Sequence, residues 1–195
     1  MKKYRSYSIL KFILNPIFRL WYNPKIKNSH NIPKDGSIVI AGNHKHLYDQ
    51  CLAIIATKRQ IRYMAKKEYF DGKMAFFFKA VGCIPVNRQS KDPDAVNAAL
   101  EVLNSGGALG IFPEGTRNKT DEFLLPFKFG AVSMAQKTNA YIVPFGLTGD
   151  YKFRSKNLMV NFGTPFKVDN MTLEEANDKL YKEVKRLMEE NLKVD

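Results

Sequence analysis

Short apolar runs alternate with amphipathic stretches along most of the chain, and this alternation is the feature that most restricts its fold. The pattern predicts strands at residues 37–42, 61–65, 83–87, 108–112, 140–147 and 158–162. It predicts helices at residues 48–57, 73–81, 93–104, 130–138 and 172–192. The last helix starts with a capping box, because Glu175 follows Thr172 at the required spacing. Strands that alternate with helices predict an α/β fold: a single-domain mixed sheet flanked by helices.

The first 30 residues are basic and amphipathic, and no acidic residue occurs before Asp35. Wound as a helix, one face carries the apolar residues Ile9, Leu10, Ile13, Leu14, Ile17, Leu20 and Trp21. The other face carries Arg5, Ser8, Lys11, Asn15 and Arg19, and Pro16 predicts a kink or a pair of short helices. No apolar run reaches the roughly 18 residues that a membrane-spanning helix needs.

We expect residues 1–30 to form an amphipathic helical membrane anchor that lies in an anionic lipid interface, with residues 31–195 as the folded domain. The alternative is a helix that packs its apolar face on the protein's own core.

The net charge of +12 predicts a partner that carries phosphate or other negative charge. Nucleic acid, anionic lipid and an acidic carrier protein all fit this charge. No nucleic-acid-binding motif is found, and the N-terminal basic residues are interleaved with bulky apolar ones, which favours lipid. The two cysteines, Cys51 and Cys83, form no CxxC pair, which indicates a reducing compartment.

The segment "NHKHLYD" follows the predicted strand 37–42, where an open α/β sheet places its ligand site. If a helix begins near Leu47, the Asp49 carboxylate in its first turn can reach back to the His44 imidazole. Such a carboxylate fixes the tautomer of the ring and leaves the other ring nitrogen basic. The alternatives are a polar turn without chemistry and a metal site that uses His44, His46 and Asp49. The metal site lacks a further ligand, so we expect no metal.

The segment "FPEGTRN" follows the predicted strand 108–112 in the same way. Gly115 lets the backbone approach a ligand closely, and Arg117 offers a planar fork for phosphate. Glu114 can hold a hydroxyl group or orient the arginine. Lys128 precedes the helix that Gly130 opens, an unfavourable place for a cation unless an anion binds there. The alternative is a simple turn with solvated charges.

Two further segments are weak signals by themselves. "GCIPVNR" is a short apolar strand that ends in Arg88, and "IVPF" contains Pro144, which indicates an edge strand or a bulge. Together with the His44–Asp49 spacing and "FPEGTRN", they occur in the order of the four sequence blocks of the glycerolipid acyltransferases. The chain most resembles the 1-acylglycerol-3-phosphate acyltransferases, over residues 37–147.

The resemblance implies an α/β fold and roles for particular residues. His44 would be the base that deprotonates the acceptor hydroxyl, supported by Asp49. The acceptor's phosphate and glycerol would bind to Arg88, Glu114, Gly115, Thr116, Arg117 and Lys128. The family usually has a serine two residues after the histidine, where this chain has His46. We therefore do not place His46 in the catalytic pair.

The activity implied is acyl transfer from acyl-CoA or acyl carrier protein to the 2-hydroxyl of lysophosphatidate, which gives phosphatidic acid. We expect direct transfer, because no serine or cysteine stands beside His44 as a nucleophile, and no cofactor. The expected location is the cytoplasmic face of the membrane, as a peripheral or monotopic protein. The alternatives are a related acyltransferase for glycerol 3-phosphate or another lysolipid, and a nucleic-acid-binding protein.

Overall fold

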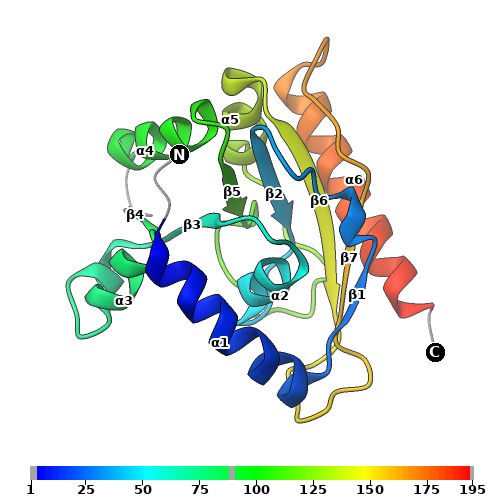
Figure 1. The fold of residues 1–195 in the computed structure, drawn as a ribbon. Helices are drawn as coiled ribbons and strands as arrows, with labels where there is room; N and C mark the ends of the chain where they lie inside the picture. The colour runs from blue at the N-terminus through cyan, green and yellow to red at the C-terminus, as the bar shows by residue number, and fades with distance from the viewer. Residues whose placement is uncertain (1–3, 88–90, 194–195) are drawn as a thin grey trace.

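A mixed, seven-stranded sheet forms the centre of the part of the chain that the structure, a computed structural model, describes: residues 4–87 and 91–193 (Figure 1). The strands are β1 (Lys25–Lys27), β2 (Ile38–Gly42), β3 (Ile61–Lys66), β4 (Ile84–Val86), β5 (Ala108–Ile111), β6 (Tyr141–Thr148) and β7 (Met159–Phe162). Their order is β1-β7-β6-β2-β5-β3-β4. The β6–β7 pair is antiparallel and the other pairs are parallel.

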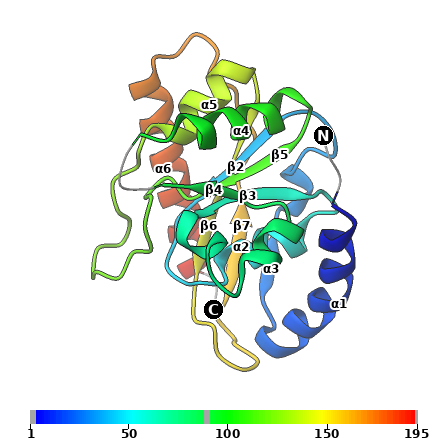
Figure 2. The same cartoon turned by 90° about the vertical axis from the view of Figure 1, so that its left-hand side faces the viewer.

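Helices cover both faces of the sheet, so the central strands are buried on both sides. One face packs against α4 (Pro93–Asn104), α5 (Gly130–Thr138) and α6 (Leu173–Leu192), as Figure 2 shows. The other face packs against α2 (Asp49–Ala56), with α1 (Arg5–Tyr22) farther out. In β2, Val39 and Ala41 face the first group of helices, whereas Ile38 and Ile40 face α2. The uninterrupted apolar sequence of β2 follows from this burial on both faces.

The predicted helices and strands are confirmed apart from small shifts at their ends. The predicted helices 93–104 and 130–138 match α4 and α5. At the start of α6 the capping box is present: the Thr172 hydroxyl accepts from the Glu175 N–H, and the Glu175 carboxylate accepts from the Thr172 N–H. The short elements are α3 (Ala75–Ala80) and two 3-10 turns, η1 (Ser29–Asn31) and η2 (Lys67–Phe70).

Two features differ from the prediction. Strand β1 pairs with β7 at one edge of the sheet, although its three residues lie in the segment predicted as the membrane interface. A three-residue strand with a single apolar residue has too little periodicity to be recognised. Pro144 lies within β6, a central strand and not an edge strand, so the edge prediction is wrong.

Pro144 is tolerated because of where its backbone points. The Ile142 N–H and C=O both bond to Phe166, and the Pro144 C=O accepts from the Gly163 N–H at 2.9 Å. The nitrogen of Pro144 therefore faces a segment beyond the end of β7, since the β6–β7 ladder begins at Phe145. No ladder hydrogen bond is lost.

Helix α1 is continuous through Pro16 and turns its apolar face outward. The exposed apolar side chains of α1 range from Leu14 (48% exposed) to Phe12 (83% exposed). The alternative in which this face packs on the protein's own core is therefore wrong. Among the described residues, no helix combines the length and the apolar character needed to cross a membrane.

The inward side of α1 carries aromatic and basic residues. Tyr7 is buried, and its hydroxyl accepts from the Ile61 N–H. Lys11 and Arg19 donate to the Thr57 and Ile55 carbonyls at the C-terminal end of α2. The last carbonyls of a helix carry a partial negative charge and lack intrahelical partners, so they suit these cations. The basic face of α1 thus attaches the helix to the domain and leaves the apolar face free.

Candidate active site

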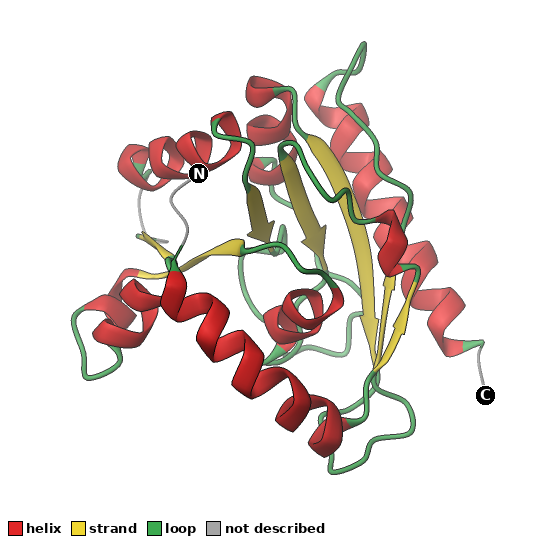
Figure 3. Cartoon of the chain, in the orientation of Figure 1, coloured by secondary structure: helices red, strands yellow, loops and turns green. Residues whose placement is uncertain are grey.

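The site lies where β2 and β5 end, because these neighbouring parallel strands point the same way. The loops that follow β2, β5 and β6 gather at this edge of the sheet (Figure 3). The Asn43 side chain joins the first of these loops to β6: it donates to the Leu147 carbonyl at 3.0 Å and accepts from the Leu147 N–H at 2.7 Å. This edge is where open α/β sheets bind their ligands.

His44 and Asp49 are in direct contact. The His44 Nδ1 lies 2.8 Å from the Asp49 Oδ2, and α2 begins at Asp49, so the carboxylate reaches back as predicted. The same oxygen accepts from the backbone N–H groups of Lys45 and His46, each at 2.7 Å. Asp49 is fully buried, whereas the His44 side chain is 11% exposed. With Nδ1 bonded to the carboxylate, Nε2 is the nitrogen that can take up a proton.

Two aromatic residues complete the surroundings of this pair. The Tyr151 hydroxyl donates to the Asp49 Oδ1 at 2.7 Å, and burial raises the pKa of Tyr151 far above its usual range, so the hydroxyl stays protonated. The Phe112 ring stacks on the His44 ring at 4.0 Å with an interplanar angle of 11°. Phe112 belongs to a recognised motif, but no signal in the sequence connects Tyr151 with a residue 102 positions away.

The two sequence motifs are joined through their backbones. The His44 N–H donates to the Glu114 Oε1 at 2.6 Å, and the His44 carbonyl accepts from the Asn118 N–H at 2.6 Å. The other carboxylate oxygen of Glu114 accepts from the Leu125 N–H at 3.1 Å. Glu114 is buried, and this burial raises its pKa. Glu114 therefore holds the loop that carries His44.

The structure brings Gly115 and Lys128 together. Gly115 has φ +72°, and a Cβ there would lie 2.9 Å from the Lys128 Nζ, so the lysine side chain lies over the glycine. Lys128 precedes α5, whose first turn holds no acidic residue and whose N-terminus has no side-chain cap. The backbone N–H groups of this turn remain available to an anion.

The remaining predicted substrate-binding residues have less definite surroundings. Thr116 is exposed and Arg117 is half-exposed in the loop after β5. No hydrogen bond or ion pair joins the Arg117 guanidinium to another residue that the structure describes. Arg88 lies outside the described residues. The part of the chain that is described contains no group of three or more His, Cys, Asp or Glu side chains that could hold a metal ion.

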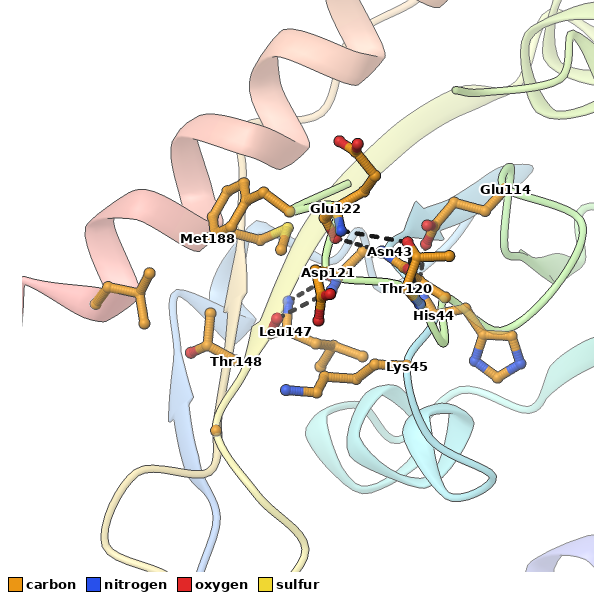
Figure 4. A pocket seen from close by; sticks show the side chains of 14 residues that line it. Asn43, His44, Lys45, Glu114, Thr120, Asp121, Glu122, Leu147, Thr148 and Met188 are labelled. Atoms are coloured by element: carbon orange, nitrogen blue, oxygen red, sulfur yellow. Dashed lines mark hydrogen bonds between the residues drawn. The ribbon is translucent and has the colours of Figure 1, made fainter. Parts of the chain in front are cut away.

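A cavity of about 280 Å³ opens beside the histidine loop (Figure 4). Its walls come from the loops after β2 and β5, from the end of β6 and from α6. Figure 4 shows the His44 ring at one margin of this space and Met188 of α6 at the opposite one. The lining combines acidic, basic and apolar side chains: Lys45, Asp121, Glu122, Phe123, Leu147 and Met188.

Fold and site together define an α/β enzyme with a histidine–aspartate pair at the carboxyl ends of its strands. A family model described as Acyltransferase matches residues 23–148. The 1-acyl-sn-glycerol-3-phosphate acyltransferase of Bacillus subtilis is 37% identical over 138 residues, which are 70% of this chain and 68% of that protein. The chain therefore belongs to the 1-acylglycerol-3-phosphate acyltransferase family and is an O-acyltransferase.

Two further comparisons agree with this assignment. The 1-acyl-sn-glycerol-3-phosphate acyltransferase of Borreliella burgdorferi is 34% identical over 141 residues, 71% of this chain and 56% of that protein. The crystal structure of the 1-acyl-sn-glycerophosphate (LPA) acyltransferase PlsC from Thermotoga maritima superposes with a TM-score of 0.77. The superposition covers 100% of this chain and 85% of the other. Because the sequence identity is 23%, this likeness shows the fold alone.

Proposed function

We propose that this chain transfers a fatty acyl group from an acyl thioester to the 2-hydroxyl of 1-acylglycerol 3-phosphate, giving phosphatidic acid. The observation that carries the proposal is the 2.8 Å contact between His44 Nδ1 and the buried Asp49 carboxylate. This contact leaves Nε2 as a base at the edge of the sheet where ligands bind. The names of the relatives support the choice of acceptor.

In the proposed reaction, His44 Nε2 removes the proton of the acceptor hydroxyl while the oxygen attacks the thioester carbonyl. The buried Asp49 carboxylate stabilises the imidazolium that forms. Collapse of the tetrahedral intermediate expels the thiolate of the donor, which takes the proton from His44. The ester bond forms as the thioester bond breaks, and His44 returns to its neutral state.

Transfer is direct, without an acyl-enzyme. Among the described residues, Asp49 is the side chain hydrogen-bonded to the His44 ring, and no serine or cysteine occupies that place. Cys51 follows Asp49 on α2, and burial together with the Asp49 charge raises the pKa of its thiol to about 12. A thiol that stays protonated is a poor nucleophile.

We assign the acceptor's phosphate to a set of cations and backbone N–H groups. In this proposal Arg88, Arg117 and Lys128 hold the phosphate, together with the Gly115–Thr116 backbone, over which Lys128 lies, and the open N-terminus of α5. Glu114 contributes by fixing the loop of His44 through a buried hydrogen bond. Such positioning lowers the activation barrier by placing the hydroxyl next to its base.

The membrane surface is the proposed location of the reaction, at its cytoplasmic face. The outward apolar face of α1 and the exposed side chains of Met74 and Phe76 near α3 support this. The Ser6 hydroxyl at the start of α1 donates to the Ala80 carbonyl at the end of α3, so the two helices touch. Together they present apolar side chains to an anionic lipid interface, with basic residues nearby.

Acyl-CoA and acyl carrier protein are both proposed as donors, and two arginines of the basic segment 58–67 have their guanidinium groups hydrogen-bonded within the chain. Arg59 donates to the Pro33, Gly36 and Gly106 carbonyls, and Arg62 donates to the Gly82 carbonyl. These two arginines therefore serve the fold.

The test is an acceptor panel, run with the purified full chain on lipid vesicles. Lysophosphatidate, glycerol 3-phosphate and other lysolipids are each supplied with long-chain acyl-CoA and, separately, with acyl carrier protein. Preferred acylation of lysophosphatidate supports the proposal. Preference for glycerol 3-phosphate or another lysolipid would replace the acceptor, and no transfer from either donor would overturn the reaction.

A further inference from the structure

The buried Asp49 carboxylate has two differently used oxygen atoms. Oδ2 serves His44 and two backbone N–H groups of its own loop, all within five residues in the sequence. Oδ1 accepts from the Tyr151 hydroxyl at 2.7 Å, which comes from the loop between β6 and β7. The orientation of the carboxylate toward His44 is thus fixed from the opposite side by a distant residue.

The Tyr151 ring is itself held on several sides. The His46 ring stacks on it at 4.3 Å with an interplanar angle of 19°. From α1, Tyr22 meets it edge-on at 5.6 Å and Phe18 at 6.5 Å. The loop of Tyr151 is tied to the end of the same helix, because the Arg154 N–H donates to the Trp21 carbonyl at 2.6 Å.

From these contacts we infer that Tyr151 is a positioning residue of the acyltransferase, which acts through Asp49 on His44. The inference rests on the proposed role of His44 as the base. His46, where the family usually has a serine, is part of the packing of Tyr151 and not of the catalytic pair. Helix α1, through Phe18 and Tyr22, supports the same ring and so contributes to the geometry of the site.

The physical effect of the hydroxyl is to fix the carboxylate and to withdraw part of its charge. A carboxylate that loses this donor is left with an unsatisfied buried oxygen. It also presents a larger share of its negative charge to the His44 imidazole. The electrostatic interaction between the carboxylate and the imidazolium of His44 is then changed. Among the described residues, the charge of Asp49 also acts on Cys51 on α2, Tyr63 on β3 and Glu114 after β5.

The test compares Tyr151→Phe with the wild-type chain, because this change removes the hydroxyl and keeps the ring. We expect kcat to fall by about tenfold, as for the loss of a hydrogen bond to a charged group, with little change in KM. The acidic limb of the pH profile of kcat/KM should also differ from that of the wild type. The matched control is Tyr141→Phe, at the exposed start of β6, which should behave as wild type.

A double-variant cycle separates positioning from general stability. If Tyr151 acts through Asp49, adding Tyr151→Phe to Asp49→Asn lowers kcat no further. Tyr22→Leu removes a ring that supports Tyr151 but keeps the Tyr151 hydroxyl. It should therefore lower kcat less than Tyr151→Phe does. Thermal unfolding of each variant checks that the chain is folded.

The outcomes are distinct. An unchanged kcat and pH limb in Tyr151→Phe, or a full additional loss in the Asp49→Asn background, would overturn the inference. If His44→Ala keeps wild-type turnover, the proposed mechanism itself fails. If His44→Ala is inactive while Tyr151→Phe equals wild type, the mechanism stands and the role of Tyr151 alone is refuted.

Discussion

The backbone N–H of His44 donates to the buried carboxylate of Glu114 at 2.6 Å, across 70 positions of sequence. This bond, with the one from Asn118 to the His44 carbonyl, makes the loops after β2 and β5 a single unit. The position of the imidazole therefore depends on both motifs.

Glu114→Gln should weaken both the fold and the activity. The amide replaces one acceptor oxygen with an N–H donor that faces a backbone N–H, at a cost of about 1–3 kcal/mol in the free energy of unfolding. Activity should fall as well, because the His44 loop loses its anchor. Chemical denaturation and initial rates measure the two effects, with the exposed Glu101→Gln on α4 as the control.

The difference in stability between the wild type and Glu114→Gln should depend on pH. Burial raises the pKa of Glu114 in the folded chain above its ordinary value of 4.5, so the folded state binds more protons than the unfolded state in that range. The stability of the wild type relative to Glu114→Gln should therefore fall as pH rises through the raised pKa. A difference that grows with pH would contradict the burial effect.

His44→Ala and Asp49→Ala should each lower transfer to a small residual rate while the chain remains folded and bound to vesicles. Loss of a general base costs roughly a hundredfold to ten-thousandfold in rate. Steady-state assays with lysophosphatidate measure this loss, and circular dichroism verifies the fold. Wild-type turnover by His44→Ala would falsify the mechanism.

His46→Ala should keep much of the activity, because the His46 side chain packs on Tyr151 and bonds to the Tyr48 N–H without touching the Asp49 carboxylate. An added chelator should likewise change the rate little. Both expectations are checked by initial rates: those of His46→Ala against the wild type, and those of the wild type with and without chelator. A loss as large as that of His44→Ala would instead assign His46 to the catalytic group.

Both thiols should resist alkylation in the folded chain. Burial raises the pKa of Cys51 to about 12 and that of Cys83 to about 11, so at pH 8 almost no thiolate is present. Iodoacetamide at pH 8 should leave activity intact and should label the cysteines once the chain is unfolded in urea. Mass spectrometry counts the labels. Rapid labelling of native Cys51 with inactivation would reopen the question of an acyl-enzyme.

The double substitution Phe12→Ser with Ile17→Ser on the exposed face of α1 should reduce binding to anionic vesicles by at least about tenfold, because an apolar side chain contributes roughly 1.5–3 kcal/mol when buried. Flotation at low and high salt measures the apolar and the electrostatic contributions. Leu192→Ser is the control, because the Leu192 side chain on α6 is also exposed, at 62%. Retained binding to polynucleotide without any to lipid would favour the nucleic-acid alternative.

Local periodicity determined most of the fold. Burial on both faces makes β2 a continuous apolar run, and the capping box marks the start of α6, so both are recognisable from a few neighbouring residues. The contact of His44 with Asp49 was predictable for the same reason: five positions across a helix start set their distance. The amphipathic pattern of α1 was visible too, but its orientation was not.

Only the tertiary structure decided the rest, because the contacts concerned join distant segments. Tyr151 meets Asp49, and Glu114 meets His44, through the order of strands in the sheet, which no local pattern encodes. The outward face of α1 depends on free carbonyls at the end of α2, which attract Lys11 and Arg19. Sequence identified the residues that we propose carry the chemistry, and the packing of the chain determined which residues hold them in place.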